Sequence, residues 1–284
     1  MAEANSAQAH HWNFDAGPGW VARQEQLDRM LEPLGERGLT TASPLAGERA
    51  IDIGCGCGAT TIALAQRVGE SGHVLGVDIS EPMLARARER CAELRLANVE
   101  LMRSDAQQAQ LPPAHDLAFS RFGVMFFDDP TAAMANIARG LDPGGRLVFV
   151  CWQARDRNPW MGIPLAAALQ HVPAPPASTP DAPGPFAFAD ANRVRSILAD
   201  AGFADIAFEG VEHELLVGGA ADLDGAAAFA ADSGSVRSVL GDVDDDTRRR
   251  AAESIRTALA PYAGRDGVRL ASAVWVVSAR KVGA

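Results

Sequence analysis

The sequence predicts an α/β protein built on a doubly wound, mostly parallel sheet of seven strands, with helical insertions. Apolar, strand-like runs alternate with helix-length segments between about residues 50 and 152, and a glycine-rich turn directly follows the first run. Two later runs have partly alternating apolar residues, which is typical of antiparallel strands with one solvated face. Strands that alternate with helices form βαβ units, so most of the sheet is expected to be parallel.

The parallel part follows in order along the chain. We expect strands at 50–53, 73–79, 99–102, 117–122 and 146–152, because each run is short and apolar. Helices are expected at 60–68, 81–94 and 131–141, where the residue pattern has helical character. Pro143 and the two glycines after it form the turn that leads into the fifth strand.

The pattern changes after Trp152. Residues 154–189 form a first insertion, and its proline-rich stretch at 172–180 excludes a continuous helix. Asp190 is a suitable N-cap for a helix at 191–201 that ends at Gly202.

The last two strands are expected at 205–216 and 268–279, with a second, largely helical insertion at 217–266 between them. In that insertion, Ser233 or Ser235 begins one helix, and the acidic run 242–246 precedes another.

These boundaries define the expected domains. Residues 1–45 form an N-terminal helical arm or lid, and residues 46–284 form the α/β domain. The insertions at 154–189 and 217–266 form a cap over the site or an interface.

Composition excludes several functions. The 284 residues carry a net charge of −10, from 26 basic and 36 acidic side chains, and Lys281 is the only lysine. A P-loop and a Schiff-base enzyme each need a lysine in their site, and a lysine in the C-terminal tail suits neither. The acidic balance argues against nucleic-acid binding.

The compartment is expected to be the cytoplasm. No run approaches the roughly 18 apolar residues of a membrane span, and the polar N-terminus lacks the apolar core of a signal peptide. The four cysteines do not form a secreted disulfide framework in a chain of this length.

The motif that carries chemistry is the segment 52–58. Glycines at 54, 56 and 58 allow a tight turn between a strand and a helix, whose positive end then faces an anionic ligand group. Asp78 ends the next strand, where a carboxylate accepts hydrogen bonds from two ribose hydroxyls. Together these features predict an adenosine-containing ligand.

Two ligand classes fit such a loop. Nicotinamide cofactors require the spacing G-x-G-x-x-G, whereas this loop reads G-x-G-x-G. Asp52 would repel a pyrophosphate but helps to hold an ammonium group, so S-adenosylmethionine (SAM) is favoured over a nicotinamide cofactor. Asp105 and Ala106 follow the third strand, where the adenine amino group would lie beside the ribose.

With these residues in place, the sequence resembles the class I SAM-dependent methyltransferases, in the broad group that includes the ubiquinone/menaquinone C-methyltransferases. The resemblance covers roughly residues 46–153, the segment 201–203 and the final strands. It implies a Rossmann-like methyltransferase fold with SAM as cofactor. The cofactor-binding residues that it implies are Asp52, Gly54, Cys55, Gly56, Gly58, Asp78, Ile79, Met83, Asp105, Ala106, Ser120 and Phe122.

The segments that border this site are rich in aromatic residues, which favours a small, largely apolar acceptor such as a phenol, a quinone precursor or a polyketide-like metabolite. The expected acceptor-binding residues are Trp12, Trp20, Phe122, Trp152, Asn158 and Trp160. No residue is identified as catalytic, although His10, His11 and His171 lie in segments near this mouth.

Several alternatives remain open. Methylation of RNA or protein is disfavoured by the acidic charge and by the absence of an Asn-Pro-Pro-Tyr signature after the fourth strand. A protein that binds SAM without transferring its methyl group is another class of function that the sequence allows. No metal is expected, because Cys55 and Cys57 lack partners at metal-binding spacing. His115 is expected at the surface, and the insertion at 217–266 forms either a homodimer surface or part of the acceptor pocket.

Overall fold

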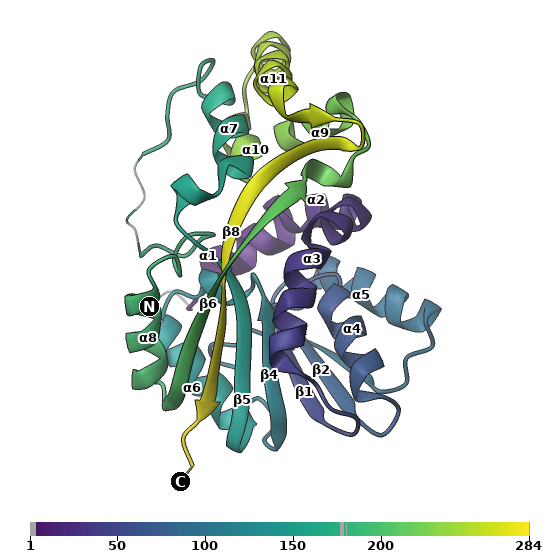
Figure 1. Ribbon diagram of the computed structural model, residues 1–284, viewed down its shortest axis with the longest axis vertical. Coiled ribbons are helices and arrows are strands. Elements are labelled where there is room, and N and C mark those ends of the chain that lie inside the picture. The colour runs from purple at the N-terminus through teal and green to yellow at the C-terminus, as the bar shows by residue number, and fades with distance from the viewer. Residues whose placement is uncertain (1–3, 177–178, 180, 284) are drawn as a thin grey trace.

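The computed structural model describes residues 4–176, 179 and 181–283 (Figure 1). The first three residues of the expected arm and the last residue of the chain lie outside the described residues. So do three positions of the expected proline-rich stretch, 177, 178 and 180.

One mixed sheet forms the centre of the molecule and confirms the predicted fold class. Its strand order is β3-β2-β1-β4-β5-β8-β6, and a two-residue strand, β7, pairs with β8. The first five strands are parallel, and β8 lies antiparallel between β5 and β6. The bounds are β1 Arg49–Ile53, β2 His73–Asp78, β3 Val99–Arg103, β4 His115–Arg121, β5 Leu141–Trp152, β6 Phe203–Leu216, β7 Ala263–Gly264 and β8 Gly267–Lys281.

Helices cover both faces of this sheet, as a doubly wound fold requires (Figure 1). One layer consists of α3 Gln24–Ala42, α4 Ala59–Val68 and α5 Glu81–Glu93, and the other contains α6 Pro130–Gly140 and α8 Ala191–Asp200. Central-strand side chains such as Ile51, Leu75 and Phe119 are fully buried between the layers. The predicted cap of α8 is confirmed, because the Asp190 carboxylate accepts the backbone N–H of Asn192 at 2.8 Å.

The two insertions pack together at one end of the molecule (Figure 1). The first contributes η3 Arg155–Arg157 and α7 Pro159–Ala168. The second contributes η4 Val217–Gly219, α9 Leu223–Ala231, α10 Gly234–Val239, α11 Asp245–Leu259 and η5 Ala260–Tyr262. Helix α7 contacts α10 and α11, so segments far apart in the sequence form one helical layer, which we call the cap. Strands β6 and β8 extend upward into it.

An N-terminal arm precedes α3. It consists of α1 Ser6–His10, the π-helical turn η1 His11–Asp15 and α2 Gly17–Ala22. The arm is fastened near the carboxyl end of β2, because the Ser80 hydroxyl donates to the Trp12 carbonyl at 2.7 Å. At Gly17, a side-chain Cβ would lie 1.9 Å from that same carbonyl oxygen, so glycine is required for this close approach.

Two expectations need correction at the amino end of the sheet. Strand β5 begins at Leu141, and the turn at 143–145 is an irregularity within it, where the register shifts opposite residues 115–117. His115 is buried, with 1% of its surface exposed, because this early start of β5 brings Leu141 opposite it. Burial lowers the pKa of His115, and its Nδ1 lies 3.2 Å from the Gly140 carbonyl oxygen.

Candidate cofactor and acceptor site

The glycine loop joins β1 to α4 with three residues in the left-handed region. Gly54, Gly56 and Gly58 have φ values of +66°, +55° and +82°, which side chains with a Cβ rarely adopt. A Cβ at Gly54 would lie 2.7 Å from the Cα of Gly123, beyond the end of β4. A Cβ at Gly56 would lie 2.8 Å from the Met83 side chain. The predicted tight turn is therefore present, and it is a cradle that only glycine allows.

Asp52 lies beneath this loop with no exposed surface. One oxygen, Oδ2, accepts hydrogen bonds from the hydroxyls of Thr60 and Thr61 at 2.8 and 2.6 Å, which fixes the first turn of α4. The other oxygen, Oδ1, is buried without a hydrogen-bond partner among the described residues. Burial raises the pKa of Asp52 to about 6. The carboxylate thus holds the loop from below and leaves one acceptor atom unpaired, which fits a cationic group bound to the loop.

Asp78 ends β2 and ties the loop to the next element. Its Oδ2 accepts the backbone N–H of Gly56, and its Oδ1 accepts that of Ser80, both at 2.8 Å. Burial raises the pKa of this carboxyl, while the backbone N–H groups act in the opposite direction. Asp78 and Ile79 both remain partly exposed, whereas Met83 is buried behind them. This geometry fits a carboxylate held ready for ribose hydroxyls.

Asp105 and Ala106 follow β3 and lie beside Asp78. The backbone N–H of Ser104 donates to the Asp78 carbonyl at 2.9 Å, which joins the two strand ends. Asp105 is partly exposed, and Ala106 is buried. The structure thus places these two residues near Asp78, and their contact with an adenine amino group stays a prediction.

Ser120 and Phe122 lie on the other side of the glycine loop. The buried Ser120 hydroxyl donates to the Ile53 carbonyl at 2.7 Å and accepts the Gly123 N–H at 3.2 Å, so it joins the ends of β1 and β4. Phe122 has a φ of +62°, uncommon for a residue with a side chain. Its ring stacks on Trp152 at the end of β5, with centroids 4.1 Å apart and planes 4° apart.

The expected acceptor-binding aromatics form two clusters. Trp152 also contacts Trp160 of α7, whose indole Nε1 is buried without a partner among the described residues. In the arm, the Trp12 ring lies edge-on to Trp20 at 6.0 Å and to Phe126 at 5.2 Å. The first cluster connects the cap to the sheet, and the second connects the arm to the segment after β4.

Asn158 has a different environment from the aromatics. It is fully buried, and its side-chain nitrogen lies within 3.2 Å of three backbone carbonyls, those of Gln153, Ala154 and Ala273. Its Oδ1 accepts the Ala273 N–H at 3.0 Å. Asn158 therefore joins the start of α7 to β8 through hydrogen bonds. Its contact with an acceptor stays a prediction.

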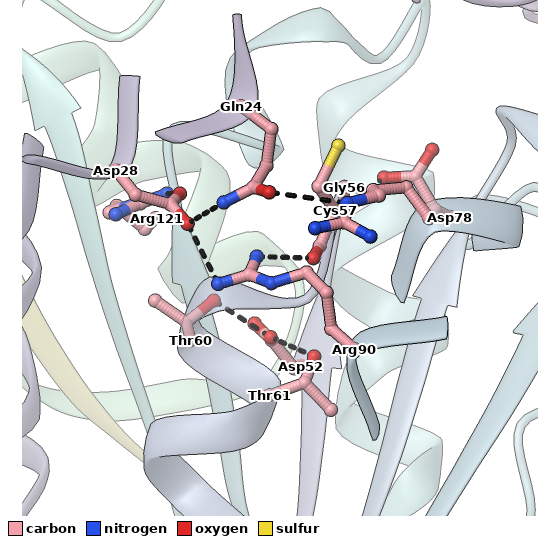
Figure 2. A network of polar contacts seen from close by, with 11 residues as sticks. Gln24, Asp28, Asp52, Gly56, Cys57, Thr60, Thr61, Asp78, Arg90 and Arg121 are labelled. Carbon is pink, nitrogen blue, oxygen red and sulfur yellow. Dashed lines mark hydrogen bonds and ion pairs between the residues drawn. The ribbon is translucent and has the colours of Figure 1, made fainter. Parts of the chain in front are cut away.

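A polar network above the loop has no counterpart in the sequence reasoning. Asp28 of α3 pairs with Arg90 of α5 at 2.8 Å and lies 3.8 Å from Arg121 at the end of β4. Arg90 also donates to the Cys57 carbonyl at 2.6 Å, as Figure 2 shows. These side chains come from three separate elements, and no spacing in the sequence connects them.

The thiols of the loop are not set up for reaction. Burial raises the pKa of Cys57 to about 12 and that of Cys55 well above its usual range. A thiolate is the reactive form, so both side chains act as packing groups. In the described ranges, no group of three or more His, Cys, Asp and Glu side chains is arranged to hold a metal ion. None of the helices described there is long and apolar enough to cross a bilayer.

Comparison with known proteins agrees with this geometry. Residues 50–145 match the family model described as a methyltransferase domain. The aklanonic acid methyltransferase DauC of Streptomyces sp. (strain C5) is 40% identical over 118 residues, which cover 41% of this chain and 54% of DauC. A demethylmenaquinone methyltransferase of Geobacillus sp. (strain WCH70) is 36% identical over 103 residues, 36% of this chain and 44% of the relative. The chain spans about half the length of the curated relatives it matches.

A solved structure shows the same fold over most of the chain. The YcgJ protein from Bacillus subtilis superposes with a TM-score of 0.56 at 16% identity, covering 88% of this chain and 98% of YcgJ. Together with the glycine loop, the match over residues 50–145 supports the resemblance to class I methyltransferases that the sequence indicated. The match also supports SAM as the predicted cofactor.

Proposed function

We propose that this protein transfers a methyl group from SAM to a small, largely apolar organic acceptor. The observation that carries the proposal is the parallel stack of Phe122 on Trp152. It lies at the carboxyl ends of β4 and β5, one residue from the Gly123 contact with the glycine loop. Ligands of open α/β sheets bind at these strand ends, so an acceptor packed against the stack lies beside the cofactor.

The cofactor supplies an activated methyl group on a sulfonium, which is its own leaving group. The chain's part is to bind and orient. Asp78 accepts the ribose hydroxyls, Asp105 accepts the adenine amino group, and the N–H groups of the glycine loop face the methionine carboxylate. Positioning alone accounts for much of the acceleration in such a displacement, which needs the reacting atoms about 3–3.5 Å apart.

The acceptor class follows from the walls of the site. Phe122 and Trp152 are 9% and 4% exposed, and Trp160 and Trp12 add further aromatic surface from the cap and the arm. Flat aromatic walls favour a planar aromatic or quinonoid acceptor over a peptide or an RNA strand. The related enzymes named for aklanonic acid and demethylmenaquinone support this choice of class.

The domain roles and the setting belong to this proposal. We assign the arm the role of a lid over the cofactor and the cap that of a cover over the acceptor, and the cap's outer surface is where a homodimer would form. The net charge of −10 favours a reaction without nucleic acid. All four cysteines are free thiols, which suits a reducing compartment such as the cytoplasm.

An acceptor screen tests the proposal. The protein is incubated with SAM and a panel of phenols, hydroxynaphthoquinones and reduced quinones, and formation of S-adenosylhomocysteine is measured. We expect turnover with at least one planar oxygenated aromatic, and Trp152→Ala should lower it about 100-fold by removing a stacking wall. Binding of S-adenosylhomocysteine without turnover on any panel member would contradict the acceptor class.

A further inference from the structure

Asn5 lies at the start of the arm, and the proposed function assigns it no part. This side chain is 2% exposed, although it lies close to the N-terminus. Its backbone is left-handed, with a φ of +55°, a conformation that asparagine tolerates better than most residues.

Hydrogen bonds hold Asn5 on every side. Its Nδ2 lies 2.9 and 3.0 Å from the two carboxylate oxygens of Asp105 and 3.1 Å from the Gln107 Oε1. Its Oδ1 accepts the backbone N–H of Asp128 at 2.7 Å, and its own N–H donates to the Asp128 carboxylate at 2.6 Å. One residue thus joins the segment after β3 to the segment after β4.

The contact with Asp105 fixes the plane of that carboxylate. A donor placed between the two oxygens holds both of them, and the Gln107 N–H, which donates to Oδ1 at 2.9 Å, adds a third contact to the carboxylate. Asp105 nevertheless remains partly exposed. A carboxylate has about four acceptor sites, so these donors leave acceptor capacity for one more donor.

We propose that Asn5 is a positioning residue that makes the site selective for a 6-aminopurine cofactor, by aiming Asp105 at the purine 6-position. This inference rests on the proposed function, because it requires SAM at the glycine loop. An ionised carboxylate only accepts hydrogen bonds, so it attracts the amino group of adenine and repels the 6-oxo group of hypoxanthine. A site built to accept a particular donor discriminates strongly against an analogue that lacks it.

The neighbouring contacts set the geometry for this selection. The backbone N–H of Ser104 donates to the carbonyl oxygen of Asp78, the residue proposed to hold the ribose. Asp105 is the next residue along the chain, so it directly follows this contact. The ribose anchored at Asp78 then directs the purine toward Asp105. Without Asn5, the Asp105 carboxylate would lose the donor that fixes its rotamer.

The experiment compares two ligands that differ only at the purine 6-position. S-adenosylhomocysteine carries the amino group, and S-inosylhomocysteine carries an oxo group there. Both are titrated by calorimetry into the full chain and into Asn5→Ala. The native protein should prefer the amino ligand, and Asn5→Ala should reduce that preference about tenfold, mainly by weakening the amino ligand.

A matched control comes from the same arm. Asn13 donates to the Ile79 carbonyl at 3.0 Å and accepts the Glu81 N–H at 3.0 Å, but makes no contact with Asp105. Asn13→Ala should therefore weaken both ligands alike and leave their ratio unchanged. Asn5→Asp, which sets a like charge against Asp105, gives a second variant and should reduce the preference at least as much as Asn5→Ala.

Each other outcome overturns the inference. Equal weakening of both ligands in Asn5→Ala would make Asn5 a purely structural anchor of the arm. Tighter binding of S-adenosylhomocysteine in that variant would make Asn5 a competitor of the adenine. Failure of the native protein to bind S-adenosylhomocysteine at all would reject the proposed function itself, a result distinct from a changed ratio.

Discussion

Asp52 shows how one residue couples the fold to the chemistry of the site. It is a charged group with no exposed surface, held by two threonine hydroxyls under the loop that should carry a cation. Burial raises its pKa from 3.8 to about 6. Burying this carboxylate costs free energy of folding, and that cost is a consequence of its position beneath the glycine loop.

This shift has a measurable effect on stability. Because the folded pKa lies above the unfolded one, the carboxyl contributes stability at pH values below about 4, which is lost as the pH rises through about 6. Between about pH 5 and about pH 7.5, the native protein should lose roughly 1 kcal/mol more unfolding free energy than Asp52→Asn. Urea unfolding at both pH values measures this difference, and parallel behaviour of the two proteins would reject the raised pKa.

A substitution at Asp78 tests the proposed part of this carboxylate in cofactor binding. Asp78→Asn places an amide nitrogen against a backbone N–H, of Gly56 or Ser80, and removes an acceptor for the ribose. We expect binding of S-adenosylhomocysteine to weaken by about 2 kcal/mol, roughly 30-fold. Asp116→Asn is the control, because Asp116 also accepts a backbone N–H, that of Arg49, but at the opposite end of the strands. Similar losses in both variants would show a general effect on folding.

Some residues were predictable from the sequence and others were not. Asp52 and Asp78 were found because fixed spacing ties them to a strand end and a glycine turn. Asn5 and Asp28 make contacts across more than 60 positions of sequence, and no local pattern marks such contacts. Cys55 and Cys57 were interpreted as residues that fill the loop, and the structure buries both of them.

At the scale of elements, the strand–loop–helix unit depends on a close approach of two backbones. A Cβ on Gly54 would lie 2.7 Å from the Gly123 Cα, and the Ser120 hydroxyl joins the same two strand ends. The unit is thus locked to the end of β4, where the acceptor wall begins. A change in the loop should therefore affect both the cofactor and the acceptor parts of the site.

Gly54→Ala tests this coupling. The added Cβ would meet the Gly123 Cα at 2.7 Å in a backbone with φ +66°, so we expect destabilisation by about 2–4 kcal/mol and loss of S-adenosylhomocysteine binding. Gly202→Ala is the control, because Gly202, just after the end of α8, also has a positive φ, +87°, and a Cβ there would meet nothing within 4 Å. That variant should show only about 1 kcal/mol of backbone strain and normal binding. Comparable melting temperatures for the two variants would contradict the close-approach argument.

The elements themselves were predictable where the pattern is periodic. The alternation of strands and helices in the parallel part, the α8 cap at Asp190 and the antiparallel β8 all follow from local sequence signals. The start of β5 was not predictable from the sequence. Its first residue, Leu141, pairs with His115 of β4, which lies far away in the sequence, although turn residues follow at 143–145. The burial of His115 was missed for the same reason.

At the scale of the whole molecule, the arm and the cap approach the strand ends from different parts of the chain. The arm reaches the cofactor side through Asn5, Trp12 and Asn13, and the cap reaches the acceptor side through Trp160. The sequence predicted an arm and a cap, but not the residues through which they contact the strand ends, because those contacts depend on packing between segments far apart in the chain.

Cofactor binding should therefore order the arm. Because the arm bonds to Ile79, Ser80 and Asp105, we expect amide hydrogen exchange in residues 4–22 to slow when S-adenosylhomocysteine is added. Exchange in α11, at the far side of the cap, should change little. An arm whose exchange is the same with and without the ligand would rule out its role as a lid.

We propose that the loop at 52–58 and the carboxylate of Asp78 together form a SAM site. Calorimetric titration of the full chain with S-adenosylhomocysteine tests it most directly. We expect saturable binding of one ligand per chain. Asp78→Asn should weaken this binding, and Asp116→Asn should leave it unchanged. Absence of binding at high micromolar ligand, with a folded protein, would contradict it.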